Sequence, residues 1–349
     1  MTTLTERFSV LDRRDQYLFG LLGALTVVAA IAPNLPGVTV YYRDVIQTGL
    51  VFVMIGVSWN MIAGYAGQVS LGHAAFFGMG AYTSAWLTSP GTLPAWMGDP
   101  ISSMLAGINS IPPLAVLFPL VTVIIGGLGA ALIALLTGPA MFRLKGHYFA
   151  IGTLALGAII QVIMNNAREY SGGATGYYVK GGADLALPGG GAISAELLQY
   201  YYAVVGAALM IVVGYYVYHA KLGLGMRAIH GDEQAADSLG VNPLQYKMYA
   251  FVLSSFLVGV AGALFAQYTL YLNPASTLSV TWTVDALVVV VLGGMGSIFG
   301  PMFGAAIFLF LDTFLTDLVG TLATTVEGVL IILFVLFLPN GLYGLLEDH

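Results

Sequence analysis

Segment 221–247 carries the clearest chemical pattern in the chain, because helix-capping and charged residues occur together there. Asp232 can cap a short helix over 233–239, since a carboxylate accepts hydrogen bonds from the free amides of a first helical turn. Glu233 adds a second acid, which suits the positive end of the helix dipole. Gly240 follows where helices commonly end in a left-handed residue. The pattern predicts a short, exposed helix between two longer ones.

The predicted short helix has the composition of a protein contact. Ala235, Ala236 and Leu239 share one face at helical spacing. Asn242-Pro243 restarts the chain as cap and first residue of the next span, so the short helix is connected directly to two membrane helices. The alternative is an amphipathic loop helix that lies on the membrane. We predict a force-transmitting contact made by Asp232, Glu233, Ala235, Ala236, Asp237, Leu239 and Gly240.

Two glycine-rich breaks interrupt apolar runs, near 64–72 and 293–301. Each break follows an inward-going span, so an internal repeat is one interpretation of their shared glycines. Interrupted helices line binding sites and pathways in many transporters, because their free backbone groups must face protein or water. A single histidine such as His73 is more often a hydrogen-bonded packing residue than a switch. We predict a translocation pathway along Asn60, Gln68, Ser70, His73, Gly293, Gly294 and Gly296.

Acidic residues remain in the last spans, where Lys and Arg are absent beyond Lys247. An acid within a membrane span is a candidate functional residue by default. Asp285 and Glu327 lie near predicted span ends, where water reaches them. Asp312 lies deepest, and it can be protonated, paired across helices or exposed to a wet pathway. Asp312 therefore joins the predicted pathway residues.

Sequence patterns for catalysis are missing from the chain. It contains no G-x-x-x-x-G-K-[ST] phosphate loop, no H-E-x-x-H and no G-x-S-x-G. There is no cysteine, and the five histidines are far apart, which excludes thiolate chemistry and argues against a metal site. We expect no cofactor and no enzymatic activity, and no feature indicates nucleic acid as a partner.

Composition identifies the class of fold. The 349 residues are 58% hydrophobic and only 8% charged, whereas soluble domains carry about 25% charged residues. A soluble fold is excluded, and the long apolar runs argue against an outer-membrane barrel. We predict a single all-α polytopic domain over 1–349, with about ten transmembrane helices, glycine-rich breaks and both termini cytoplasmic. The expected location is the cytoplasmic (inner) membrane, with the lipid bilayer around the spans.

The expected topology follows from the apolar runs and the basic residues. Eight of the eleven Lys and Arg residues fall on the cytoplasmic side when the N-terminus is inside. That side holds the N-terminal segment 1–16 and the loop 221–247, whereas the long loops 89–112 and 165–198 face outward as solvated linkers or as a docking surface. The predicted spans are 17–32, 45–63, 73–88, 114–137, 147–164, 199–218, 247–268, 284–300, 302–318 and 322–338.

Small residues recur every four positions on two predicted spans. Gly126, Ala130, Ala134 and Gly138 form one stripe, and Ser255, Gly259 and Ala263 form another. Such stripes let helix backbones approach closely in lipid. We predict that both stripes pack inside one subunit rather than between subunits.

Four motifs in this order resemble the permeases of branched-chain amino-acid ABC importers. The stretch 63–82 (AGYAGQVSLGHAAFFGMGAY) is similar to the signature of that family, and 143–155 (RLKGHYFAIGTLA) resembles its LivM-type subunit. Segment 225–242 is similar to the cytoplasmic "EAA" loop, and 291–301 (VLGGMGSIFGP) to a late glycine turn. The sequence departs from the family pattern in 171–176 (SGGATG) and at Gln234, which interrupts Glu-Ala-Ala.

The resemblance implies an importer with several subunits. A second homologous permease of the LivH type would complete the pathway, two cytoplasmic ATP-binding-cassette subunits would hydrolyse ATP, and an extracytoplasmic binding protein would deliver the solute. Alternating access driven by the ATPases would move branched-chain amino acids inward. Related permeases carry urea and short amides, and the spans do not discriminate between these solutes. A proton-coupled transporter using Asp312 and a non-transporting scaffold are the alternatives from other classes.

Overall fold

Nearly all of the described chain is helical. The computed structural model describes residues 13–180, 182, 184–186 and 192–322, with 325–326, 328–330, 332 and 341. The longer α-helices are α2 (Arg13–Ile31), α3 (Val40–Asn60), α4 (His73–Thr88), α5 (Ala95–Asn109), α6 (Pro112–Met141), α7 (His147–Asn166), α9 (Ala195–His219), α10 (Lys221–Gly231), α12 (Pro243–Thr269), α14 (Thr281–Gly293) and α15 (Gly300–Val319).

Short elements connect these helices. The short α-helices are α8 (Arg168–Ser171), α11 (Glu233–Ser238) and α13 (Pro274–Thr277), and a π-helical turn, η2 (Met61–Tyr65), continues α3. Four 3-10 turns are η1 (Ala32–Asn34), η3 (Pro90–Thr92), η4 (Gly173–Thr175) and η5 (Gly320–Leu322). The two-residue strands are β1 (Tyr177–Tyr178), β2 (Leu185–Ala186), β3 (Ala192–Ile193) and β4 (Tyr271–Leu272).

Local sequence explains where several helices begin. Asn242 Oδ1 accepts a hydrogen bond from the Gln245 amide at 3.2 Å, and Pro243 is the first residue of α12. This confirms the predicted restart of the chain, because asparagine caps free amides and proline needs no amide partner there. Ser194 caps α9 in the same way, with its hydroxyl 3.4 Å from the Leu197 amide.

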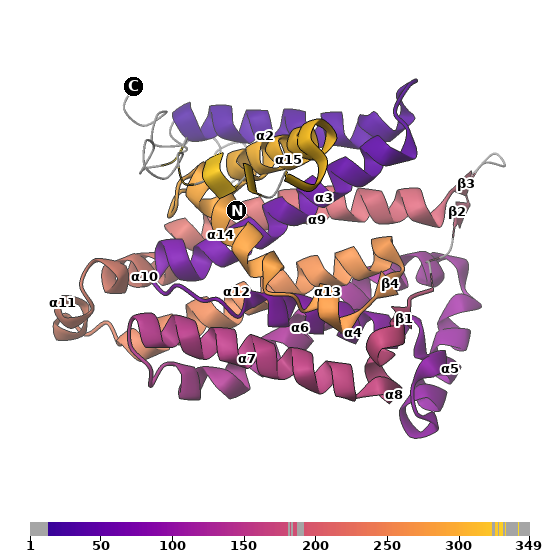
Figure 1. The fold of residues 1–349 in the computed structure, drawn as a ribbon, viewed down its shortest axis with the longest axis horizontal. Coiled ribbons are helices and arrows are strands. Elements are labelled where there is room, and N and C mark those ends of the chain that lie inside the picture. Colours follow the sequence, from indigo (N-terminus) through magenta and orange to yellow (C-terminus); the bar gives the residue numbers. More distant parts are fainter. Residues whose placement is uncertain are drawn as a thin grey trace, which may run out of the picture.

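Helices α4, α6 and α12 pack closely at the centre of the fold (Figure 1). A Cβ atom at Gly80 would lie 2.1 Å from the Gly259 carbonyl oxygen, and one at Gly259 would lie 2.5 Å from the Ala130 Cβ atom. Only glycine permits these distances, so the backbones touch, as small-residue stripes allow in lipid. The two predicted stripes therefore face α4 and each other within one chain, as expected.

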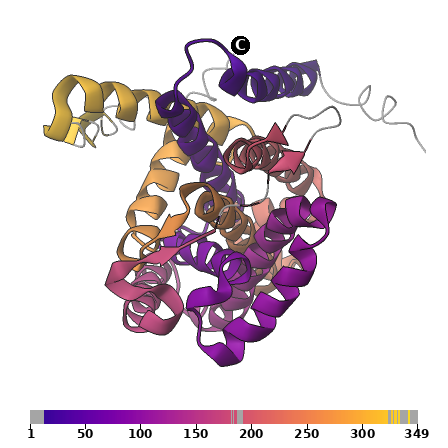
Figure 2. The same cartoon turned by 90° about the vertical axis from the view of Figure 1, so that its right-hand side faces the viewer.

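The helices form a bundle, in which α2 and α15 lie along one edge and α7 along the other (Figure 1). The view along the bundle shows α3 and α14 between these two edges (Figure 2). Helices α10 and α11 lie at one end, while α5, α8 and the strands lie at the opposite end (Figure 1). The segments predicted to face opposite sides of the membrane thus occupy opposite ends of the molecule.

Seven described helical segments are long and apolar enough to cross a membrane. Six of them coincide with predicted spans, and the seventh overlaps the predicted span 284–300 only over 284–293. These helices are Gln16–Asn34, Val40–Tyr65, Leu114–Met141, His147–Asn166, Ala195–His219, Pro243–Thr269 and Pro274–Gly293. The predicted span 73–88 is the 16-residue helix α4, and 302–318 falls in α15. Most of 322–338 lies outside the described residues. The structure confirms a polytopic helical fold, while the count of ten remains a prediction.

Two boundaries differ from the sequence prediction. Residues 89–112 were expected to be an outward-facing loop, either a solvated linker or a docking surface, yet they contain the 15-residue helix α5 with Pro100 inside it. The span expected over 284–300 ends at Gly293, because Gly294 has φ +111° and the chain turns there before α15. A Cβ atom at Gly293 would lie 1.9 Å from the Gly300 carbonyl oxygen. This turn therefore requires glycine.

The predicted loop 165–198 contains short ordered elements. Strand β1 pairs antiparallel with β4, with Tyr177 opposite Leu272, and this pairing ties the loop to the end of α12. Segment 171–176 forms a tight turn, in which Gly172 has φ +73° and a Cβ atom there would lie 1.9 Å from the Gly176 carbonyl oxygen. Strands β2 and β3 form a second antiparallel pair.

Candidate functional site: the coupling segment and the two breaks

The short helix predicted after Asp232 is α11, Glu233–Ser238. Asp232 Oδ1 accepts hydrogen bonds from the amides of Gln234 and Ala235, both at 2.9 Å. Gly240 follows with φ +86°, which is the left-handed conformation that ends helices. The local prediction of cap, helix and terminating glycine is confirmed. We call 221–247, with α10 and α11, the coupling segment.

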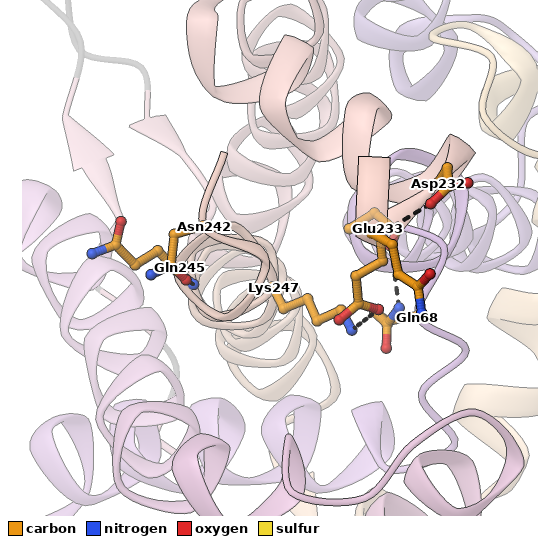
Figure 3. A network of polar contacts seen from close by, with 8 residues as sticks. Gln68, Asp232, Glu233, Asn242, Gln245 and Lys247 are labelled. Carbon is orange, nitrogen blue, oxygen red and sulfur yellow. Dashed lines mark hydrogen bonds and ion pairs between the residues drawn. The ribbon is translucent and has the colours of Figure 1, made fainter. Parts of the chain in front are cut away.

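An ion pair attaches α11 to the first turns of α12. Lys247 Nζ lies 2.6 Å from Glu233 Oε2 (Figure 3). The lysine side chain is 14% exposed and the glutamate 50% exposed, so solvent screens the pair and it contributes at most about 1 kcal/mol. The Val241 amide also donates to the Ala236 carbonyl at 3.0 Å. The ion pair thus connects α11 to α12, whereas the Val241 contact closes the C-terminal turn of α11 itself.

One predicted feature of α11 is wrong. Ala235, Ala236 and Leu239 were expected to share a contact face, but Ala236 is buried against the protein core, whereas Ala235 and Leu239 are exposed. Because α11 contacts α10 and α12, the side that carries Ala236 faces the body of the protein. Leu239, the residue after α11, is a large apolar side chain that is 85% exposed, and Glu233 and Asp237 of α11 are exposed as well.

Helix α10 connects α11 to the body of the protein. Its Met226 and Ile229 are buried, and the Arg227 guanidinium lies 3.7 Å from the ring centroid of Tyr218 on α9. A Cβ atom at Gly225 would lie 2.1 Å from the Tyr246 ring. The Arg227 guanidinium thus stacks on a ring of α9, and the backbone at Gly225 lies against a ring of α12. Helix α10 is therefore packed against both α9 and α12.

The first break begins with a π-helical turn at the end of α3. Its backbone groups are paired with the protein, as irregular backbone at membrane depth requires. The Ser70 carbonyl accepts from Trp59 Nε1 at 2.8 Å, and the Leu71 amide donates to Thr153 Oγ1 at 3.0 Å. Gln68 is partly exposed, and its side chain donates weakly to the Ala66 carbonyl at 3.4 Å. The break is therefore a fixed structure.

Asn60 joins the two breaks. Its Nδ2 donates to the Ser297 carbonyl at 2.7 Å, and its Oδ1 accepts from the Gly296 amide at 2.8 Å. The asparagine is 1% exposed, so neither hydrogen bond competes with solvent. Gly64 lies against this contact, because a Cβ atom there would meet Asn60 Oδ1 at 2.1 Å and the Gly296 nitrogen at 2.6 Å. Two segments more than 230 residues apart thus meet at one side chain.

His230 connects the coupling segment to the same point. Its Nδ1 lies 2.9 Å from the Gly64 carbonyl oxygen, so the ring nitrogen carries a proton and donates it. A Cβ atom at Gly67 would meet the His230 ring at 2.7 Å. A continuous set of contacts therefore runs from α10 through His230 and Gly64 to Asn60. Sequence reasoning missed His230 and Ser297, because only the fold brings them to the breaks.

His73 packs as a hydrogen-bonded core residue. Its Nδ1 and Nε2 lie 3.0 Å from Ser70 Oγ and Ser254 Oγ, respectively, and the ring is 1% exposed. The Ser254 hydroxyl donates to the Phe251 carbonyl, so its oxygen accepts from Nε2–H. Nδ1 of the neutral ring then accepts from Ser70. His73 thus ties α4 to α12, and both of its nitrogens have partners.

Asp312 lies apart from the other candidate pathway residues. It is partly buried on α15, twelve residues after that helix begins, and no described residue forms a hydrogen bond or ion pair with it. Gly293, Gly294 and Gly296 instead lie at the second break with Asn60. Within the described ranges, no group of three His, Cys, Asp or Glu side chains is arranged to hold a metal ion.

These features define the class of protein: a multi-pass helical membrane permease with interrupted helices at its centre and a short capped helix at one end. Comparison with known proteins agrees. The chain belongs to the family described as branched-chain amino acid transport system / permease component, whose model matches residues 41–338. It is a transport permease rather than an enzyme.

Individual relatives match over most of the chain. It is 28% identical to the high-affinity branched-chain amino acid transport system permease protein LivM of Escherichia coli over 319 residues, or 86% of this chain and 69% of that protein. LivM of Salmonella typhimurium is 27% identical over 341 residues, or 92% and 74%. LivH of Salmonella typhimurium is 22% identical over 312 residues, or 86% and 93%.

Proposed function

We propose that this chain is the LivM-type permease subunit of an ATP-binding-cassette importer in the inner membrane, and that it carries branched-chain amino acids into the cytoplasm. The printed names of its relatives support this solute class. The observation that carries the mechanism is the coupling segment, a capped helix that projects from one end and is attached to two membrane helices. Both termini and α11 face the cytoplasm in this proposal, which eight of eleven basic residues support.

A homologous LivH-type permease, two cytoplasmic ATPase subunits and an extracytoplasmic binding protein complete the proposed importer. The chain has no phosphate-binding loop, so ATP hydrolysis is assigned to the separate ATPases. Leu239, Glu233 and Asp237 contact an ATPase subunit. The outer loops 89–112 and 165–198, which lie at the opposite end from α11 (Figure 1), face the binding protein.

Coupling in this proposal uses two routes from α11. The Glu233–Lys247 pair moves α12, while α10 displaces the first break through His230 and Gly64. Because Asn60 holds the second break to the first, both breaks move together. Solute then passes beside them, along the predicted pathway residues Asn60, Gln68, Ser70, His73, Gly293, Gly294, Gly296 and Asp312.

Charge reversal on α11 tests the proposal. In proteoliposomes that contain the complete importer, Glu233→Lys with Asp237→Lys should lower ATP-dependent leucine uptake by about fivefold or more, the range of typical coupling energies. Stimulated ATP hydrolysis should become independent of solute. Lys145→Ala, which removes an exposed charge on the same predicted side, is the control and should transport normally.

The contrary outcomes are distinct. Unchanged coupling in the α11 variant, with the importer fully assembled, would refute the docking assignment. Uptake that persists without the ATPases and collapses with the proton gradient would replace the proposal by a proton-coupled transporter. Uptake of urea or acetamide in place of leucine would retain the class and change the solute.

A further inference from the structure

A cavity of about 390 Å³ lies between α2 and the body of the bundle. Its walls come from α2, α3, the middle of α9 and the first half of α15. Helix α2 lies along one edge of the molecule, as α15 does (Figure 1). None of the described lining residues belongs to either glycine break, so this cavity is separate from the candidate site described above.

The wall of this cavity is almost entirely hydrocarbon. Among the described lining residues, Thr26 alone has a side chain with an oxygen or nitrogen atom. Its hydroxyl group donates to the Leu22 carbonyl of the same helix at 2.7 Å, so this group is already paired. Apolar cavities that offer no polar partners do not hold ordered water. The molecule that occupies this cavity is therefore apolar.

Contacts near both ends of α2 hold this helix at its distance from the bundle. Near its start, the Phe19 ring meets the rings of Tyr215 and Phe299 edge-on, with centroids 4.7 Å and 5.5 Å apart. Near its end, the Tyr200 hydroxyl donates to the Ala29 carbonyl at 2.7 Å. Because the helix is attached at both places, it cannot move inward and close the cavity without losing these contacts.

Small side chains line the cavity between these two attachments. Ala207 and Ala208 lie there on α9, and Ala305 and Ala306 lie there on α15. Larger aliphatic residues at these positions would fill the space, as side chains do in most protein interiors, which contain few voids larger than a water molecule. The sequences of α9 and α15 thus leave room beside α2.

The cavity opens sideways, toward the surroundings of the spans. Leu25 and Val28 of α2 line it and are 45% and 62% exposed, respectively. Helices α2, α3 and α9 lie in segments that are long and apolar enough to cross a membrane, so the opening meets lipid. An empty cavity at this depth would lose van der Waals contacts, and the loss grows with its volume. Acyl chains are the apolar molecules that the bilayer supplies there.

We infer that this cavity is a lipid site, in which one acyl chain of a membrane phospholipid lies between α2 and the helices α9 and α15. An apolar cavity of about 150 Å³ already binds benzene, so the larger volume of this cavity accommodates a longer hydrocarbon. The acyl chain gains packing contacts rather than burial from water, because it comes from hydrocarbon surroundings. The inference goes beyond the proposed function, and it does not depend on which solute the protein carries.

Photochemical labelling in the native membrane provides the first test. A phospholipid with a diazirine in its acyl chain is added and irradiated, and the labelled residues are mapped by mass spectrometry. Val204 and Ala207 of α9 line the cavity and are each 3% exposed, whereas Val205 and Leu209 of the same helix are exposed. Val204 and Ala207 should be labelled, but Ala81, which is buried in α4 outside the cavity, should not. Label confined to exposed residues such as Val205 and Leu209, as expected if a partner subunit fills the cavity, would overturn the inference.

Filling the cavity provides the second test. Ala208→Phe places a ring in the space from α9, so the label on Val204 and Ala207 should be lost. Ala155→Phe is the matched control, because Ala155 is exposed on α7 along the opposite edge of the bundle (Figure 1), and it should leave that label unchanged. If Ala208→Phe does not accumulate in the membrane, Ala306→Leu fills the same space from α15. Label that persists on Val204 and Ala207 in a correctly inserted filling variant would overturn the inference.

Discussion

Replacement of Asn60 tests whether the two breaks form one mechanical unit. Asn60→Leu keeps the approximate size of the side chain and removes both hydrogen bonds, to the Ser297 carbonyl and from the Gly296 amide. Each bond contributes about 0.5–1.5 kcal/mol net, and a buried group left unpaired costs about 1–3 kcal/mol. Bonds between membrane helices average lower, near about 0.6 kcal/mol.

The burial of Asn60 and the nature of its partners decide which of these free-energy costs applies. Asn60 is buried and both partners are backbone groups of a glycine turn, so neither can rotate toward a new partner. We therefore expect Asn60→Leu to lower the free energy of unfolding by about 2–4 kcal/mol. This is the cost of leaving the Ser297 carbonyl and the Gly296 amide unpaired, reduced by the packing that the leucine side chain adds. Unfolding by SDS titration in mixed micelles measures this change.

The control is Asn166→Leu on α7, because Asn166 is exposed and bonds only to the Val162 carbonyl of its own helix. It should change stability by less than about 0.5 kcal/mol, as surface substitutions usually do. If Asn60→Leu and Asn166→Leu unfold at the same SDS fraction, the bridging role assigned to Asn60 is incorrect.

Two further predictions concern the contacts around Asn60. Gly64→Ala should abolish assembly or uptake, because its Cβ would meet Asn60 Oδ1 at 2.1 Å. Gly157→Ala should assemble normally, because its Cβ would lie 3.7 Å from Gly72 Cα, an ordinary van der Waals distance. Co-purification with the partner subunits measures both outcomes. His230→Phe keeps an aromatic ring but removes the donor to the Gly64 carbonyl at 2.9 Å. Uptake should therefore fall about fivefold or more, while ATP binding persists. Normal uptake by this variant would show that coupling does not pass through His230.

Local features of the coupling segment were predictable from sequence. The Asp232 cap, α11, the terminating Gly240 and the Asn242-Pro243 restart depend on neighbours within four residues. Capping rules are local, so one sequence contains the needed information. The burial of Ala236 was not predictable, because it depends on how α11 packs against the body of the protein.

Contacts between distant segments were outside the reach of sequence reasoning. The glycines of both breaks were recognised as candidate pathway residues, but their meeting at Asn60 depends on how α3 and α14 pack. His230 carried no sequence signal, since an isolated histidine occurs in many helices. Helix α5 was missed because its Pro100 and serines resemble a linker.

Helix α12 runs unbroken from Lys247, which pairs with Glu233 on α11, to Thr269 beside strand β4 at the opposite end of the molecule. Its 27 residues give a rod about 40 Å long, with proline only at its first position. A rotation of about 5° around its midpoint would displace each tip by about 2 Å, in opposite directions. If the ATPases drive the end that carries Lys247, as we propose, the opposite end of the helix would move at the same time, with no separate signal travelling between them.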